Sequence, residues 1–168
     1  YTVTLNTNNC PKGSIGDYVW KDANRNGKQD ATEAGVGAVK VILWSATTTG
    51  TPVAKLDSTT TAAGTGKYLF SNLLKGDYVV QFVKSTLPAD CSAFTAKDTT
   101  AAGTTDTNDS DADKVTGITA KVTLDPKVLS GTSSPADSLA TNNLTVDAGL
   151  LAPLGAILLT RIAGLRSA

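Results

Sequence analysis

The chain of 168 residues contains no histidine, so it lacks the side chain that most often serves as a general base or a transition-metal ligand. Its 15 lysines and arginines are balanced by 15 aspartates and glutamates. A formal net charge of zero gives no reason to expect a nucleic-acid or anionic-membrane partner. Aromatic residues make up only 5% of the chain, whereas threonine, alanine and glycine are abundant. This composition is typical of an extended, surface-exposed β protein.

Cysteine is also scarce, and the two cysteines, Cys10 and Cys91, allow one intramolecular disulfide. The sequence begins at Tyr1 rather than at methionine, as it would after removal of a secretion signal, and secreted proteins form disulfides. We therefore predict a Cys10–Cys91 bond, which would close a loop of about 80 residues and stabilise the fold by roughly 4 kcal/mol. The alternative is a pair of buried free thiols.

Short β-strand patterns recur along the chain. They occupy residues 1–7, 14–20, 39–43, 51–60, 66–83, 118–125 and 143–151. Pro52 places segment 51–60 at a sheet edge. Segment 66–83 contains two alternating runs, one with Tyr68 and Phe70 and one with Tyr78 and Phe82, which predict a hairpin that supplies most of the aromatic core. Because no convincing helix precedes residue 150, the sequence predicts an all-β sandwich.

The sequence DANRNGKQDATE, residues 22–33, has the ligand spacing of an EF-hand calcium loop, with Gly27 at the sharp turn. This loop joins two predicted strands instead of two helices. Its predicted ligands are the side chains of Asp22, Asn24, Asn26, Asp30 and Glu33 and the backbone carbonyl of Lys28. Oxygen donors without histidine or cysteine favour Ca²⁺ over Zn²⁺. The alternative is a solvated turn rich in asparagine, aspartate and glycine.

A second acidic stretch runs from Asp98 to Asp113 and contains five aspartates with no lysine or arginine between them. Such a cluster is unfavourable unless water or a cation neutralises it. The stretch is therefore either a flexible polar loop or a further cation site.

Three blocks of the sequence, residues 13–43, 66–82 and 143–150, resemble the SdrD B-like repeats of bacterial surface proteins. The blocks occur in the same order as in that family, and together they extend over residues 13–150. The resemblance implies a calcium-binding, Ig-like (prealbumin-like) antiparallel β-sandwich, related to the B-type modules of collagen adhesins. It also implies an extracellular location at the cell surface.

The resemblance has a consequence for the acidic stretch, because members of the family often carry Asp-rich loops that bind further calcium. It therefore implies a second ion with Asp109, Asp111 and Asp113 as ligands. Asp17 and Asp147 are better interpreted as ordinary carboxylates at strand ends than as outer ligands.

Related adhesin modules also form isopeptide crosslinks between a lysine and an asparagine or aspartate. Lys21 or Lys40 with Asn143 or Asp147 is the arrangement that this sequence offers.

Two extensions flank the predicted body, residues 1–12 with an alternating strand and residues 151–168, an apolar tail. The apolar run of the tail is too short, and too often interrupted, to span a bilayer comfortably. We predict that the extensions pair with a sheet edge of another copy and so build a homopolymer by strand addition. The alternatives are that the extensions fold back on their own sandwich, or that the tail is a remnant of an envelope-sorting signal and marks attachment to the cell envelope.

No catalytic constellation is visible, so we expect neither an enzyme nor a small-molecule substrate. The sequence favours a structural role as a calcium-stiffened subunit of an extracellular filament or cell-surface stalk. The competing hypothesis is an adhesive surface module that binds a host or matrix ligand.

Overall fold

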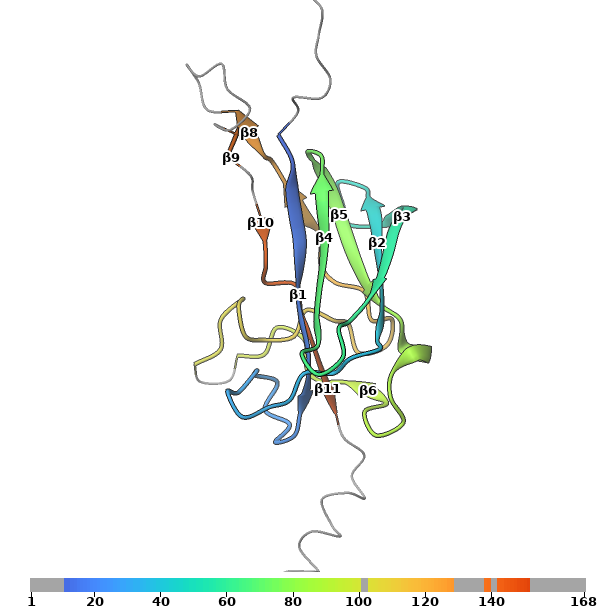
Figure 1. Cartoon of the computed structure of the whole chain (residues 1–168), viewed down its shortest axis with the longest axis vertical. Helices are drawn as coiled ribbons and strands as arrows, with labels where there is room; N and C mark the ends of the chain where they lie inside the picture. The colour runs from blue at the N-terminus through green and yellow to red at the C-terminus, as the bar shows by residue number, and fades with distance from the viewer. Residues whose placement is uncertain (1–10, 101–102, 129–137, 140–141, 152–168) are drawn as a thin grey trace, which may run out of the picture.

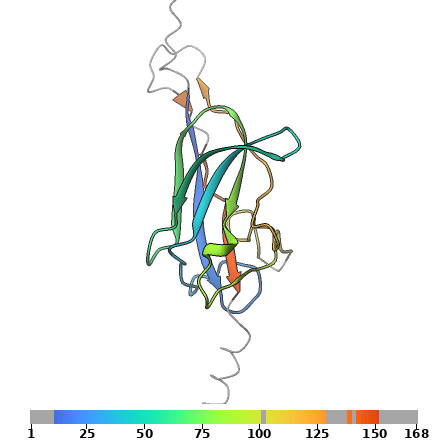
Figure 2. The same cartoon turned by 90° about the vertical axis from the view of Figure 1, so that its right-hand side faces the viewer.

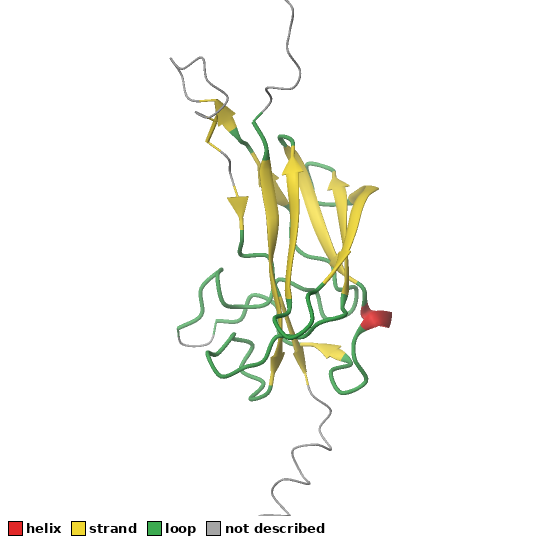
Figure 3. Cartoon of the chain, viewed as in Figure 1, coloured by secondary structure: helices red, strands yellow, loops and turns green. Residues whose placement is uncertain are grey.

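The computed structural model describes residues 11–100, 103–128, 138–139 and 142–151. These residues form a β-sandwich, which confirms the predicted fold class (Figure 1). Among them the helical structure is limited to η2 (Lys84–Thr86), a single 3₁₀ turn (Figure 3). No helix in the described ranges is long and apolar enough to span a membrane.

The first sheet is built around the long strand β1. Its members are β4 (Lys67–Leu73), β1 (Gly13–Asp22), β10 (Asn142–Asn143), β11 (Ala148–Leu151) and β6 (Ala93–Phe94). One edge of β1 pairs with β4, and the other edge pairs first with β10 and then with β11.

The second sheet has four strands, in the order β3 (Pro52–Thr60), β2 (Lys40–Ala46), β5 (Gly76–Phe82) and β7 (Val122–Leu124). In the described part of the chain β3 pairs with β2 alone, so it is the edge strand that Pro52 predicts. The short strands β8 (Lys127–Val128) and β9 (Ser138–Leu139) form a separate pair.

The core lies between the two sheets and follows the period-two alternation of the strands. In β2, Val41 and Leu43 are fully buried, because alternate side chains of a strand point to the same face. The ring of Tyr68 in β4 meets the ring of Phe82 in β5 edge to face, with centroids 5.6 Å apart. Aromatic rings from both sheets thus meet in the centre of the core.

The predicted hairpin over residues 66–83 is wrong, although both of its strands form. β4 pairs with β1, whereas β5 pairs with β2 and β7, so the two strands belong to opposite sheets. A hairpin would place Tyr68 and Phe82 side by side on one sheet face. The chain instead crosses between the sheets after Asn72, which has a left-handed φ of 61°, and the two aromatic faces bury each other.

The first and last strands of the sandwich are parallel neighbours, unlike the other long pairs. The register of β1 with β11 runs from Val19 opposite Ala148 to Asp22 opposite Leu151. Figure 2, turned by 90°, shows β11 beside the lower part of β1. Because the two strands run in the same direction, the described chain enters the sandwich at one end and leaves it at the opposite end (Figure 1).

Several predictions concern residues outside the described ranges: the strand at residues 1–7, the tail beyond Leu151, and Cys10. Cys91 is buried without a disulfide, close to Lys21 near the end of β1, whereas Cys10 precedes the beginning of that strand. The Cys10–Cys91 bond and the homopolymer therefore stay predictions.

Candidate metal centre

The loop of residues 22–33 leaves the end of β1 and lies beside residues 96–100 and 103–113 at the same end of the sandwich (Figure 1). Two left-handed residues, Arg25 with φ 63° and Gly27 with φ 77°, turn the chain sharply inside the loop. A Cβ at Gly27 would lie 3.0 Å from the side chain of Thr99. Glycine therefore serves both the backbone conformation and the close packing of the two segments.

The carboxylates at the two ends of the loop hold its backbone together. The oxygens of Asp22 accept hydrogen bonds from the backbone N–H groups of Asn26 (3.2 Å) and Gly27 (3.0 Å). The oxygens of Glu33 accept from Ala23 (2.8 Å) and Asp30 (3.1 Å). The loop is thus closed on itself, with its first and last predicted ligands turned inward.

Asp30 occupies the middle of the same cluster. Its Oδ2 accepts hydrogen bonds from Nδ2 of Asn24 at 2.7 Å and from Nδ2 of Asn26 at 2.8 Å. These two bonds, that from Asn24 first, favour the ionised carboxylate and hold the pKa of Asp30 below its usual value. Among the predicted side-chain ligands, Asn24, Asn26 and Asp30 thus contact one another directly, whereas Asp22 and Glu33 bond the loop backbone. The predicted carbonyl donor, Lys28, lies at a β-bridge with Asp109.

The side chain of Asp147, just before β11, is completely buried, and neither of its carboxylate oxygens has a hydrogen-bond partner among the described residues. Its backbone N–H donates to Oδ2 of Asp111 at 2.9 Å, and its carbonyl accepts from the N–H of Asp111 at 3.1 Å. Burial, and after it the charges of Asp111 and Asp17, raise the pKa of Asp147 to about 10. Burial likewise raises the pKa of Asp111 to about 7.

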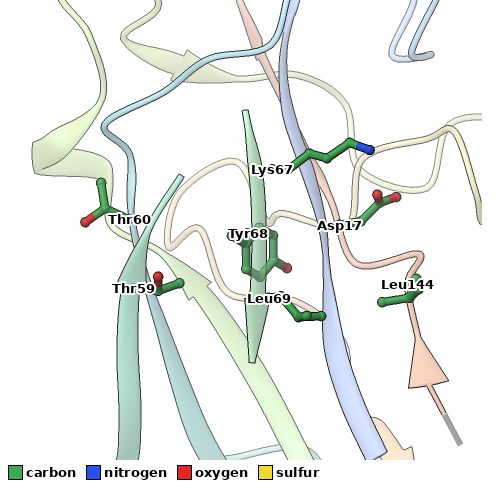
Figure 4. A pocket seen from close by; sticks show the side chains of 7 residues that line it. All are labelled: Asp17, Thr59, Thr60, Lys67, Tyr68, Leu69 and Leu144. Carbon is green, nitrogen blue, oxygen red and sulfur yellow. The ribbon is translucent and has the colours of Figure 1, made fainter. Parts of the chain in front are cut away.

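The packing around Tyr68 explains why these carboxylates lie inside the fold. The hydroxyl of Tyr68 donates to the carbonyl of Val146 at 2.6 Å, which fixes the backbone just before Asp147. Asp17 pairs with Tyr68 in the ladder of β1 and β4, and burial raises the pKa of its carboxyl too. An open pocket of about 470 Å³ is lined by Asp17, Tyr68 and Leu144 together with residues of β3 and β4 (Figure 4).

The structure does not bring Asp113 to Asp111, although both are predicted ligands of a second ion. Oδ1 of Asp113 accepts hydrogen bonds from the backbone of Val115 (3.0 Å) and from the backbone and hydroxyl of Thr116 (both 2.8 Å), so this side chain caps its own turn. Asp147, which the sequence assigned to a strand end, is the residue that faces Asp111. Its place in the apolar stretch between Val146 and Ala148 is the signal that marks it as a buried acid.

Neither lysine considered for an isopeptide bond faces Asp147. Nζ of Lys21 lies 3.0 Å from Asp90, and Lys40 is exposed on β2 in the other sheet. Among the described residues, no three histidine, cysteine, aspartate or glutamate side chains are already grouped so that they could hold a metal ion. Any cation bound at either acidic cluster therefore needs carboxamide, carbonyl or water oxygens as well.

Residues 13–150 match the SdrD B-like domain family. The chain belongs to this family. Serine-aspartate repeat-containing protein E of Staphylococcus aureus strain USA300 is 42% identical over 108 residues, which are 64% of this chain and 8% of that protein. Serine-aspartate repeat-containing protein C of strain N315 is 43% identical over 107 residues, 64% of this chain and 10% of that protein. The bone sialoprotein-binding protein of strain MRSA252 is 46% identical over 72 residues, 43% of this chain and 6% of that protein.

The chain thus spans a tenth or less of the length of each of these relatives. The comparison confirms the resemblance and the extracellular, cell-surface location. The chain is therefore one domain of the kind found in these surface proteins.

The raised pKa values of the buried carboxyls predict how the stability of the SdrD B-like domain depends on pH without divalent cations. The folded chain retains protons on Asp111 and Asp147 that the unfolded chain releases above pH about 4. Their stabilising contribution is therefore complete below that pH and is lost as the pH rises towards 7 and 10. Chemical denaturation in excess chelator should show the free energy of unfolding falling from pH 5 to pH 8, by at most about 1.4 kcal/mol per pH unit for each proton.

Replacing Asp147 by asparagine removes one of these protons and should flatten the decline. Constant or rising stability of the unsubstituted chain between pH 5 and pH 8 would contradict the prediction.

Proposed function

We propose that this SdrD B-like domain is a calcium-stiffened, load-bearing spacer within a cell-surface protein. The observation that supports it is the pair of parallel strands β1 and β11, with an acidic cluster at one end of each strand. Asp22, the last residue of β1, belongs to the loop cluster, and Asp147 directly precedes the first residue of β11. Cations at these clusters would fix both strands at the point where they pair.

The parallel pairing determines how the sandwich responds to tension. A pull on the segment before Gly13 and on the segment after Leu151 moves β1 and β11 in opposite directions along their axes. The hydrogen bonds between Val19–Asp22 and Ala148–Leu151 are then loaded together, in shear, instead of opening one after another. This geometry suits a spacer that must keep its length under load.

The loop cluster has the chemistry that calcium requires. Ca²⁺ takes six to eight oxygen ligands, from carboxylates, carboxamides, carbonyls and water. The loop carries carboxylates on Asp22, Asp30 and Glu33 and carboxamides on Asn24 and Asn26, and both carboxamides already contact Asp30. Rotation of the two carboxamides would turn their oxygens, in place of N–H, towards the ion beside Asp30.

The second cluster supports a cation for a different reason. A buried carboxylate without a hydrogen bond is costly, and both oxygens of Asp147 are in this state. A divalent cation would compensate its charge together with that of Asp111, whose Oδ2 already accepts the N–H of Asp147. We therefore propose Asp111 and Asp147 as ligands of the second ion, with Asp147 in place of the predicted Asp113.

Replacement of Asp147 by asparagine tests the second site, because its effect on stability should have opposite signs in chelator and in calcium. In excess chelator at neutral pH the variant should be more stable than the unsubstituted chain, because it removes the cost of burying an acid. In calcium it should be less stable, because a bound ion contributes about 2.7 kcal/mol when its free concentration is 100 times its Kd. Thermal melts of both proteins in chelator and in millimolar calcium measure this reversal in their order of stability.

Asp57→Asn is the matched control, because Asp57 is exposed on β3 and its side chain bonds only the adjacent Ser58 N–H. Its melts should follow those of the unsubstituted chain under both conditions. Identical melts of the unsubstituted chain in chelator and in calcium would refute calcium stiffening altogether.

The load-bearing role predicts a mechanical effect of calcium. In single-molecule pulling through both chain ends, the unfolding force should be high in calcium and should drop in chelator, since the shear contact loses its support at Asp22 and Asp147. Glu33→Gln should reduce the force in calcium, because it weakens the carboxylate that closes the loop. An unfolding force that does not depend on calcium would show that the sandwich alone carries the load.

Strand addition between copies is a second proposal, favoured by the exposed edge of β3. In the described part of the chain β3 pairs on one side only, and its Val53 and Leu56 are 63% and 52% exposed. Sedimentation velocity should then show assembly that is lost on deletion of residues 1–8 or in Leu56→Lys. A chain that stays monomeric at high concentration in calcium would exclude this polymer and leave the spacer function intact.

A further inference from the structure

We infer that the two acidic clusters are one coupled unit, in which a cation at either cluster increases the affinity of the other. This inference rests on the two cation sites proposed above and adds a property that neither site has alone. Two separate sets of contacts, one through Thr95 and one through Asp109, connect the loop 22–33 to the Asp111–Asp147 pair.

Thr95 makes the first connection. It is 2% exposed, and its hydroxyl donates to Oδ2 of Asp22, the same oxygen that accepts the N–H of Gly27. Its backbone N–H donates to the carbonyl of Gly149 at 2.9 Å, two residues beyond Asp147. A Cβ at Gly149 would lie 2.5 Å from Cγ2 of Thr95, so only glycine permits this approach. Thr95 thus fixes a ligand of one cluster to the strand that carries the other.

The second connection is strand-like. Lys28 and Asp109 form an antiparallel bridge, and the N–H of Gln29 donates to the carbonyl of Asn108 at 2.7 Å. Ser110, which follows Asp109, is fully buried, and its hydroxyl oxygen accepts a hydrogen bond from the N–H of Gly149 at 3.2 Å. Asp111 follows directly. The far side of the loop is therefore fixed to the backbone that positions Asp111.

Coupling follows from the closed path that these contacts form. A cation in the loop orders Asp22 and Lys28 together, and these residues hold Thr95 and Asp109 in place. The ordering of the segments around Asp111 and Asp147 is then already complete when the second ion binds, so the second ion binds more tightly. By thermodynamic linkage the effect is reciprocal, and the two sites must change each other's affinity by the same factor.

Calorimetric titration of the full chain with calcium chloride tests the inference, using one variant for each part of the path. Glu33→Gln impairs the loop cluster and Asp147→Asn impairs the second cluster, so in each variant the other site is measured while its partner site is impaired. Each remaining site should bind calcium about 5-fold or more weakly than the same site does in the unsubstituted chain. The two factors should agree.

Thr95→Val separates coupling from ligation, because valine keeps the shape of threonine and lacks only the hydroxyl. This variant should still bind both ions, but the coupling factor should fall towards one. Thr119→Val is the matched control: Thr119 is also buried, yet its hydroxyl bonds Val80 and Ala120 away from both clusters. It should leave the coupling factor unchanged.

Each outcome is decisive. If the unsubstituted chain binds two ions and each variant binds its remaining ion with unchanged affinity, the coupling is overturned and the proposed calcium sites stand. One ion or none in the unsubstituted chain would overturn it as well, and none would also remove the proposed function. If Glu33→Gln does not fold, Thr95→Val against Thr119→Val still decides, because equal coupling in these two proteins excludes the path through Thr95.

Discussion

The parallel pairing of β1 with β11 is the contact on which the rest of the structure depends. It brings the last residue of β1, Asp22, opposite Leu151, and it places Asp147 and Gly149 beside the same strand. The approach is close: a Cβ at Gly149 would lie 2.8 Å from the ring of Trp20. Because the two strands are far apart in sequence, this single contact closes the sheet, sets the opposite exits of the chain and gathers the acidic residues at one end.

The same contact creates an electrostatic conflict. Closing the sheet buries Asp147 next to Asp111, with Asp17 near enough to raise the pKa of Asp147 further. Like charges in a desolvated place oppose folding unless they hold protons or a cation. Without a cation, the fold therefore keeps protons at the price of stability that declines with pH. With a cation, the same carboxylates would favour the closed sheet, and the stability of the domain would become linked to the calcium concentration outside the cell.

Sequence reasoning succeeded where the determining contacts are local. The donors of the loop of residues 22–33 follow a fixed spacing within twelve residues, and in the structure Asn24 and Asn26 contact Asp30 while Asp22 and Glu33 bond the backbone of the same loop. Strands β1 to β5 form at or near the predicted segments because alternation is also a local signal.

Sequence reasoning failed where the partner of a residue lies far along the chain. Nothing local distinguishes a strand pair that folds into a hairpin from one that crosses between sheets, so β4 and β5 were assigned to each other instead of to β1 and β2. Asp111 and Asp147 are separated by 36 positions, and hydrogen bonds between residues 110–111 and residues 147–149 bring them together. Asp113 shows the reverse, because its carboxylate accepts local hydrogen bonds from the hydroxyl and N–H of Thr116 and does not contact a distant ligand in the described part of the chain.

The aspartate at position 147 is the strongest support for the proposed second cation. An asparagine there would have the same shape and would avoid the cost of a buried acid, so a sandwich that only had to be stable would gain from it. With the proposed ion, an aspartate would give less stability in the absence of the ion and more in its presence. The carboxylate would then make rigidity conditional on the ion, and its position directly before β11 would apply that condition to a strand that a pull on both chain ends loads.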